Sequence, residues 1–381
     1  MTRTFLSLFL LLCFSTSAAL AEDIGNNNFR VTILPVGKGM ELAGIIRGNN
    51  DLLAARSPLF SLTLRRRGGQ TGLTISSRDN WAQVTTSNDG TTCRFVFTNP
   101  DNAAFPDTLT ATLDIAVSGD RSQWHLSVNG VGNNHSLMNI TFPEVNIAAP
   151  GNDQVLIPKY SGTLLPNPVA GNINKNLYYP RGWSATMQFL AYYNTQYGIY
   201  LGFHDPKASL KHFIIRATNG HLNFRGTWPA ADKTVAGNDF HMDGPFELDL
   251  FSGDWFDAAR IYKQWAAQHA EYWPKMTAER KLRQAALGRI NVWGSYMEDT
   301  SVSMETMKNE MSDFIALFQD DLDIPVGIHW YRWNDKEFDD DYPDYFPERD
   351  GMSALIDDIQ QSGNAAVMPY INGRLYDTDL T

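Results

Sequence analysis

The stretch SGDWFDAARIYKQWAAQHAEYW at residues 252–273 decides the fold, because the hydrophobic period of the chain changes there. Asp254 is placed to cap a helix, and Pro274 is placed to end it. Between them, residues recur every three or four positions and predict one buried face of a helix: Trp255, Ala259, Tyr262, Ala266, His269 and Trp273. We expect this face to pack against a neighbouring domain rather than to bind a ligand through His269.

Before this helix, the chain shows the period of β-strands. From about residue 29 to residue 250, short apolar runs alternate at period two, as in FRVTIL at 29–34 and WHLSV at 124–128. Turn signals such as NDG at 88–90 separate many of the runs, and no helical pattern interrupts them. The pattern predicts a large antiparallel β-sandwich over residues 22–251.

After the helix, strand and helix patterns alternate. Apolar strands are predicted at 289–294, 325–331 and 365–371, and helices at 303–318 and 352–361. This order predicts a parallel sheet, as in a (β/α)8 barrel. A closed barrel takes about 250 residues, far more than Gly288 to Thr381 supplies. We therefore expect a linker helix region at 252–287 and an incomplete barrel at 288–381, holding the first three strands.

Composition limits the function. The 381 residues include 31 basic and 42 acidic side chains, giving a net charge of −11, which argues against a nucleic-acid partner. The aromatic content of 12% suits either a large core or a cleft that binds sugars. Composition alone does not choose between those two.

The amino terminus predicts export. Residues 1–21 read as a cleavable signal peptide, with Arg3, an apolar core from Phe5 to Phe14, and cleavage after Ala21. We expect a periplasmic or extracellular protein without a membrane span, since no later segment offers about 20 apolar residues. Cys93 would then be the one remaining cysteine, and its strand pattern predicts a buried, inert thiol.

Several segments carry a resemblance to a known family: INVWGSY at 290–296, GIHWYRWND at 327–335, DDDYPDYFPERDG at 339–351 and MPYINGRLYD at 368–377. With the order sandwich, helix and barrel, they resemble an uncharacterised bacterial family of glycoside hydrolases. Its layout is that of α-galactosidases and endo-α-N-acetylgalactosaminidases, in which a galactose-mutarotase-like β-sandwich precedes a catalytic barrel. The resemblance covers nearly all of the chain after the signal peptide.

This resemblance implies an activity and places its residues. Glycoside cleavage normally needs two carboxyl groups astride the scissile bond. In such enzymes they follow the fourth and sixth barrel strands, so no catalytic residue is identified here. We expect the chain to be the amino-terminal part of an exported glycoside hydrolase that acts on a complex glycan or polysaccharide. The 381-residue chain itself should be inactive, and no cofactor is expected.

The ends of the first three strands are expected to form one wall of the substrate cleft. Aromatic faces stack on sugar rings, and polar side chains bind hydroxyl groups. The candidate substrate-binding residues are Trp293, His329, Trp330, Trp333, Asp335, Tyr370, Asn372, Arg374 and Asp377. Alternatives stay open: Trp330 or its neighbour Tyr331 could pack inside the fold, His329 could be a core residue, and Arg374 could pair with Asp377.

The acidic loop from Asp335 to Asp350 could hold calcium, but its spacing fits no known loop motif, and we assign no metal. A solvated loop is the favoured interpretation. Two other functions stay open: a non-catalytic carbohydrate-binding or scaffold protein, and a lyase or epimerase acting in the sandwich. For the latter, nothing in the sequence pairs a histidine with a partner among His204, His212, His221 and His241.

Overall fold

The computed structural model describes residues 21–273, 285–290, 292–297, 301–338, 340–361, 364–373 and 377. The chain divides into two compact units, Met1–Trp273 and Pro274–Thr381. Two predictions fall outside the described residues: the signal peptide, apart from Ala21, and the sugar contact by Arg374.

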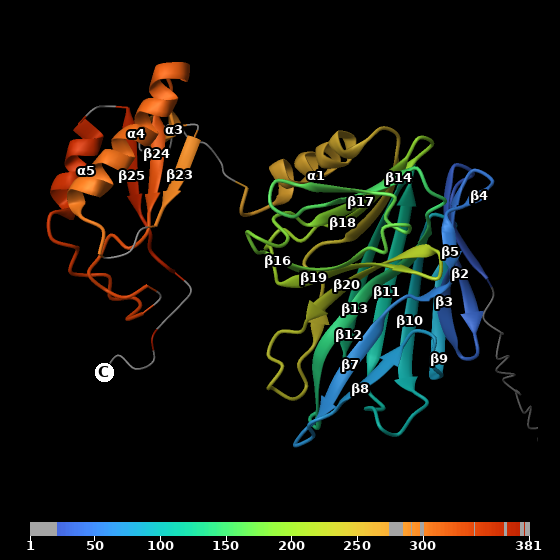
Figure 1. The fold of residues 1–381 in the computed structure, drawn as a ribbon. Helices are drawn as coiled ribbons and strands as arrows, with labels where there is room; N and C mark the ends of the chain where they lie inside the picture. Colours follow the sequence, from blue (N-terminus) through green and yellow to red (C-terminus); the bar gives the residue numbers. More distant parts are fainter. Residues whose placement is uncertain are drawn as a thin grey trace, which may run out of the picture. The chain divides into compact units, whose positions relative to one another are not determined.

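A ten-stranded antiparallel sheet forms one layer of the first unit (Figure 1). Its order is β15-β14-β17-β18-β22-β12-β11-β10-β9, with β21 paired to β12. The strands are β9 (Trp81–Asn88), β10 (Thr92–Pro100), β11 (Thr110–Ser118), β12 (Arg121–Asn129), β14 (Asp153–Ile157), β15 (Thr163–Pro166), β17 (Phe189–Asn194), β18 (Gly198–Phe203), β21 (Phe240–His241) and β22 (Phe246–Phe251).

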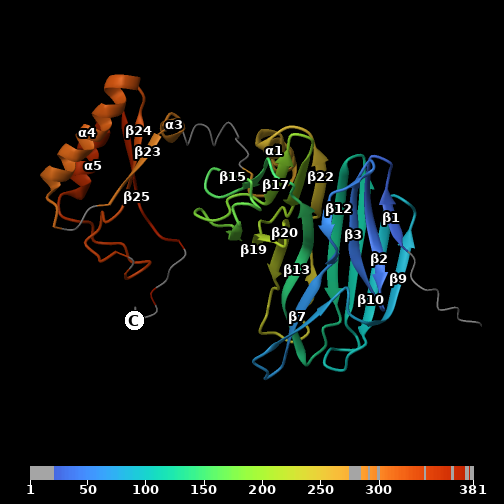
Figure 2. The ribbon, with the colours of Figure 1, turned by 45° about the vertical axis from the view of Figure 1, so that its right-hand side comes forward.

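A seven-stranded antiparallel sheet of order β16-β19-β20-β13-β7-β8 forms the other layer, with β5 paired to β13 (Figure 2). Its strands are β5 (Leu53–Ala55), β7 (Ser61–Arg66), β8 (Gly72–Ser76), β13 (His135–Ala148), β16 (Asn174–Tyr179), β19 (Lys211–Thr218) and β20 (His221–Pro229). A small sheet completes the unit: β1 (Glu22–Gly25), β2 (Phe29–Val36), β3 (Gly39–Arg47), β4 (Asn50–Asp51) and β6 (Ser57–Pro58).

One apolar core joins the two large sheets, because alternate side chains of each strand point inward. On β12, Trp124, Leu126 and Val128 are buried while the residues between them face outward. Trp124 meets Phe142 of β13 at a ring distance of 6.4 Å. The period-two pattern therefore reflects a real sandwich, and the prediction of a β-rich first domain is confirmed.

Helix α1 (Trp255–His269) packs on the ten-stranded sheet and belongs to the first unit. Asp254 caps it as predicted, since its side chain accepts a hydrogen bond from the Phe256 amide. The buried stripe differs from the prediction: it runs at spacings of four through Ala258, Tyr262, Ala266 and Ala270, whereas Trp255 and His269 are exposed. Alanines on this stripe let the helix approach the sheet closely, and the larger Tyr262 stacks on Phe189 of β17.

The second unit holds a three-stranded parallel sheet of order β23-β24-β25. Its elements are α3 (Ala285–Gly288), β23 (Val292–Tyr296), α4 (Met304–Leu322), β24 (Val326–Trp330), α5 (Met352–Gln361) and β25 (Ala365–Pro369). Met307, Met311 and Ile315 of α4 form a core with β24, as their spacing predicts. The parallel pairing is confirmed, while membership of an incomplete (β/α)8 barrel stays a prediction.

Within the described part of the chain, no helix has the length and apolar character needed to cross a membrane.

Candidate functional site

The parallel sheet of the second unit has two different faces. Val326, Ile328 and Trp330 of β24 lie on the face that packs against α4 and α5. The alternate positions, Gly327 and His329, lie on the opposite face, where Trp293 of β23 packs over Gly327. A side chain on Gly327 would meet the Trp293 ring, so the glycine makes room for the indole. This second face bears the sequence-predicted site residues Trp293 and His329.

Aromatic rings gather where β24 and β25 end. Tyr331 directly follows β24, Tyr370 directly follows β25, and their rings stack at 4.4 Å with an angle of 19°. His329 lies 4.8 Å from Tyr331 and 5.7 Å from Tyr370, and Phe338 lies 6.0 Å from each tyrosine, measured between ring centroids. We call His329, Tyr331, Phe338 and Tyr370 the ring cluster. All four side chains are only partly buried, so ring surface remains open to a ligand.

Hydrogen bonds fix the loop that carries Tyr370. The Tyr370 amide donates to the Trp330 carbonyl at 2.8 Å, and its carbonyl accepts from the Trp333 indole at 2.8 Å. Asn372 donates through Nδ2 to the Tyr370 hydroxyl at 3.0 Å, and its backbone is bonded to the Tyr345 hydroxyl. The Tyr370 ring is therefore held in place next to an amide side chain, an arrangement suited to sugar recognition.

The structure separates the predicted tryptophans. Trp330 is 1% exposed and meets Tyr296 edge to face at 5.0 Å, so it is a core residue and offers no surface to a substrate. Trp333 is also buried, and its indole N–H is used by the loop. Trp293 is 39% exposed and so keeps side-chain surface for a ligand. Alternation along β24 explains the result: Trp330 points to the helices, whereas His329 points away from them.

The polar candidates are spread along the loops. Asp335 is exposed, and its amide donates to the Pro347 carbonyl at 3.0 Å. Asp377 is partly buried, and its amide donates to the Tyr342 carbonyl at 2.8 Å. These backbone hydrogen bonds place both aspartates on the loops that follow the strands. Of the nine candidates, the structure thus brings together His329, Tyr370 and Asn372.

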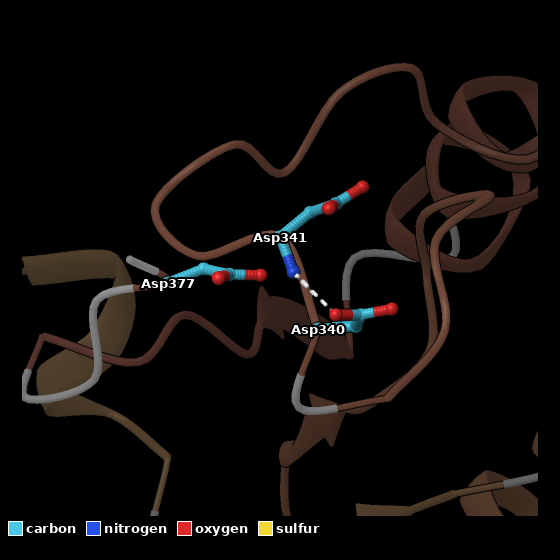
Figure 3. Close-up of side chains that lie close together, drawn as sticks. All are labelled: Asp340, Asp341 and Asp377. Atoms are coloured by element: carbon cyan, nitrogen blue, oxygen red, sulfur yellow. Dashed lines mark hydrogen bonds between the residues drawn. The ribbon is translucent and has the colours of Figure 1, made fainter. Parts of the chain in front are cut away.

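An acidic cluster lies beside Asp377 (Figure 3). Carboxylate oxygens of Asp340, Asp341 and Asp377 lie within 4.8 Å of one another. Lys336 donates to Asp341 at 3.0 Å, and this hydrogen bond raises the pKa of the lysine. The lysine already balances part of the negative charge, and clustered exposed carboxylates are ordinary on a protein surface. We assign no metal here.

The first unit holds a second group of chemically active residues, which the sequence did not pair. His204 follows β18, and its Nε2 lies 2.8 Å from the Tyr200 hydroxyl while its Nδ1 lies 3.4 Å from Glu247 of β22. Trp265 of α1 stacks on the imidazole at 4.5 Å. Arg121 lies 3.1 Å from Glu247 and 3.3 Å from Asp249. We call His204, Glu247 and Asp249 the sandwich triad; a cavity of about 210 Å³ adjoins its first two members.

Burial controls the charges of the triad. Burial lowers the pKa of His204, which favours a neutral ring with Nδ1–H facing Glu247. Burial and the neighbouring Glu247 carboxylate raise the pKa of Asp249 well above its usual range. Glu247 goes the other way: burial opposes its charge, but hydrogen bonds with His204 and Gln123 hold its pKa low. Two neighbouring carboxylates thus carry about one charge between them.

The triad is a poor site for acid and base catalysis despite these residues. His204, Glu247 and Asp249 are 2%, 1% and 4% exposed, and Trp265 covers the histidine. Almost none of the imidazole surface is exposed, although the cavity of about 210 Å³ borders it. The structure supplies the histidine partner that a lyase or epimerase needs, but it does not give access to it. Cys93 is likewise buried, and burial raises its thiol pKa to about 12.

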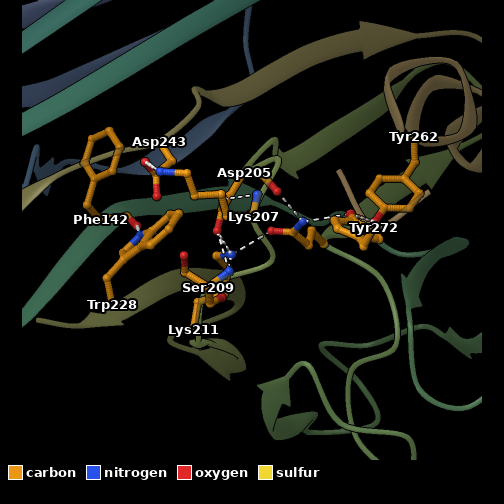
Figure 4. A network of polar contacts seen from close by, with 10 residues as sticks. Phe142, Asp205, Lys207, Ser209, Lys211, Trp228, Asp243, Tyr262 and Tyr272 are labelled. Atoms are coloured by element: carbon orange, nitrogen blue, oxygen red, sulfur yellow. Dashed lines mark hydrogen bonds and ion pairs between the residues drawn. The ribbon is translucent and has the colours of Figure 1, made fainter. Parts of the chain in front are cut away.

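A buried lysine anchors the chain that follows α1 (Figure 4). Lys211 is fully buried and donates to Gln188 at 2.6 Å, to Asp205 at 2.9 Å and to the Ser209 carbonyl at 2.8 Å. Gln188 in turn donates to the Tyr272 hydroxyl at 2.9 Å. Burial lowers the pKa of Lys211 to about 8, despite the nearby carboxylate. Each polar group has a partner, which is the mark of a structural network.

Sequence reasoning missed two features of the ring cluster. Tyr331 and Phe338 were not among the candidates, although Tyr331 stacks directly on Tyr370. A usable signal existed, because Tyr331 and Tyr370 lie at the carboxyl ends of the predicted strands 325–331 and 365–371, and such positions meet at one edge of a parallel sheet. Phe338 reaches the cluster from the acidic loop, and no periodic pattern marks it.

Three known protein groups are similar to parts of this chain: a family of unknown function, proteins described as glycoside hydrolases, and solved glycosidase structures. Residues 240–381 match the family model described as "Domain of unknown function (DUF6259)". A "Putative glycoside hydrolase" from Bacteroides thetaiotaomicron is 25% identical over 236 residues, which are 62% of this chain and 33% of that protein. The chain resembles proteins described as glycoside hydrolases. A second protein of that description, from Monosiga brevicollis, is 25% identical over 222 residues, covering 52% of this chain and 18% of its own length.

A solved structure agrees with the fold. The α-N-acetylgalactosaminidase NagBb from Bifidobacterium bifidum, in complex with GalNAc, aligns with a TM-score of 0.62 and 13% identity over 93% of this chain. The alignment spans 61% of the NagBb chain, and this chain spans a third or less of the curated relatives named above. The similarity to glycoside hydrolases predicted from the sequence is therefore confirmed, and the solved structure supports the fold.

Proposed function

We propose that this chain is part of an exported glycoside hydrolase and that the ring cluster, with Asn372, contacts a sugar of its glycan substrate. The observation that carries the proposal is the stacked pair Tyr331 and Tyr370, held at the carboxyl ends of two parallel strands beside an amide side chain. Barrel enzymes place their substrates at this end of the strands. The glycoside-hydrolase relatives support a carbohydrate as the ligand.

The proposal includes a mutarotase-like sandwich, an incomplete barrel and catalytic carboxylates outside this chain. Three parallel strands are described after residue 285, whereas the resemblance places the two carboxylates after the fourth and sixth strands. The ring cluster would then bind and orient sugar without cleaving it. The 381-residue protein should release no nitrophenol from aryl glycosides, and any release that depends on Asp335 or Asp377 would contradict this part of the proposal.

The sugar contact is tested by titrating the 381-residue protein with N-acetylgalactosamine, galactose and glucose. Saturation-transfer NMR detects the binding of each sugar. N-acetylgalactosamine is included because NagBb is an α-N-acetylgalactosaminidase. Tyr370→Ala and Asn372→Ala should each weaken sugar binding about tenfold, the effect of one good hydrogen bond or stacking contact.

The matched control is Asn364→Ala, which removes the same side chain just before β25, at the opposite end of the strand. This variant should bind sugar like the unchanged protein. Equal binding by all variants would overturn the assignment of the ring cluster. A further outcome is possible: Tyr370→Ala and Asn372→Ala lose sugar binding as predicted, but no longer product of the gene contains a carboxylate pair. This outcome would favour a non-catalytic carbohydrate-binding protein.

A further inference from the structure

Three consecutive arginines lie at one end of the sandwich, where β7 leads into β8. Arg65, Arg66 and Arg67 line a concavity of about 480 Å³ together with Gln70, Ser136 and Thr234. Figures 1 and 2 both show the β7–β8 hairpin extending beside the loop between β20 and β21, which supplies Thr234. We call this set the arginine pocket. It lies in the first unit and shares no residue with the ring cluster.

The three guanidinium groups lack acidic partners. Among the described residues, no carboxylate lies within ion-pair distance of Arg65, Arg66 or Arg67. Elsewhere in the sandwich, most arginines have an acidic partner: Arg30, Arg56, Arg78, Arg94, Arg121 and Arg225. Three adjacent positive charges repel one another, and a chain with a net charge of −11 has carboxylates to spare. Leaving this cluster uncompensated is the arrangement expected where an anion binds.

The opposite wall of the pocket is held in place. Asn238 accepts from the Leu137 amide at 2.7 Å and donates to the Leu137 and Ala231 carbonyls at 2.9 and 2.7 Å. The Gly237 amide donates to the His135 carbonyl at 2.8 Å. These bonds tie the loop carrying Thr234 to β13, the neighbour of β7. The concavity is therefore built between two anchored segments, with Ser136 and Thr234 lining it together with the arginines.

We infer that the arginine pocket binds the acidic groups of an anionic glycan, sulfate esters or uronate carboxylates. Guanidinium groups recognise planar and tetrahedral oxyanions through paired hydrogen bonds. Gln70, Ser136 and Thr234 supply further groups for neighbouring hydroxyls. The choice of a glycan over other polyanions rests on the proposed function, while the choice of an anion rests on the pocket.

The test uses acidic polymers and variants of the arginine pocket, whereas the test of the proposed function uses neutral monosaccharides and variants of the ring cluster, so either test can fail without the other. The 381-residue protein is titrated with chondroitin sulfate, polygalacturonate, neutral dextran and double-stranded DNA at 50 mM and 300 mM NaCl. Binding to at least one acidic glycan is expected, and it should weaken with salt because polyanion binding releases counterions. The triple variant Arg65→Gln, Arg66→Gln, Arg67→Gln should lose at least about tenfold in affinity.

Two further variants make the result decisive. Arg216→Gln removes an exposed arginine of β19 that also lacks a carboxylate partner among the described residues, and it should leave binding unchanged. Thr234→Asp places a negative charge in the pocket from its other wall and should weaken binding even if the triple variant folds poorly. Failure to bind any acidic glycan, equal binding by the pocket variants, or tighter binding of DNA than of the glycans would each overturn the inference.

Discussion

The buried lysine of the sandwich and the ring cluster of the second unit combine aromatic rings and polar groups in opposite ways. Lys211 lies 4.9 Å from the centroid of Tyr179 and 4.7 Å from that of Trp228, with each of its three donors used inside the protein. In the ring cluster, Tyr331 and Tyr370 stack but stay partly exposed. The first arrangement has nothing left to offer a ligand, whereas the second does. Residue types alone therefore do not mark a binding site; open surface does.

The largest effect should come from removing the lysine. Lys211→Met leaves the Asp205 carboxylate buried without its cation, and we expect a loss of about 3–5 kcal/mol in the free energy of unfolding. Urea denaturation measures it. Lys207→Met is the matched control, since Lys207 makes an exposed pair with Asp243 and its loss should not move the midpoint. Equal stability of Lys211→Met and the unchanged protein would show that the network is not structural.

The adjacent residues His329 and Trp330 of β24 differ in burial: Trp330 lies in the core of the second unit, whereas His329 is partly exposed. Trp330→Ala should cost about 3–5 kcal/mol, because the variant leaves a cavity against Tyr296 and the helices. Hydrogen exchange of the β24 amides measures the loss of local stability. Slow exchange retained in this variant would contradict the placement of Trp330 in the core.

The sandwich triad predicts a dependence of stability on pH. The pKa of Asp249 is raised in the folded protein, so the folded state holds a proton that the unfolded state releases above about pH 4. Stability from this group therefore falls as the pH rises from 4 through neutral. Asp249→Asn removes this dependence. The free energy of unfolding of the variant, relative to that of the unchanged protein, should therefore be at least about 1.4 kcal/mol higher at pH 8 than at pH 4, the equivalent of one pKa unit.

The measurement compares urea midpoints of the two proteins from pH 4 to pH 8, and their difference isolates Asp249 from His204. Asp114→Asn is the control, since it removes an exposed carboxylate of β11 in the same sheet. Parallel curves for Asp249→Asn and the unchanged protein would show that Asp249 is ionised in the fold.

The smallest change in stability is expected at the ring cluster. Tyr331→Ala removes one stacked ring and should cost no more than about 1.5 kcal/mol. Its main effect should be on sugar binding, measured as for Tyr370→Ala. If Tyr331→Ala lost as much stability as Trp330→Ala and still bound sugar, the ring cluster would be part of the hydrophobic core and not a binding site.

Local sequence patterns predicted the helices and strands, whereas contacts between residues distant in the sequence could not be predicted from them. The cap at Asp254, the apolar face of α4 and the bounds of α5 follow from spacing along the chain. The pairing of His204 with Glu247 does not, because β18 and β22 become neighbours only when the sheet forms. Trp330 and His329 are adjacent in sequence, and only the side that the helices cover decides which one is buried. The buried face of α1 was also not predictable from spacing, because it depends on the sheet against which the helix packs.

The pairing of β12 with β22 has a consequence for how the protein is made. Arg121 lies opposite Asp249, so the middle of the ten-stranded sheet cannot close until the ribosome has released the chain up to β22. Strands β9 to β12 would wait as an open meander with the β12 edge still unpaired, and such edges invite association with other chains. Nonlocal closure of this kind also slows folding. During synthesis, the nascent sandwich is therefore expected to be most vulnerable between the emergence of β12 and that of β22.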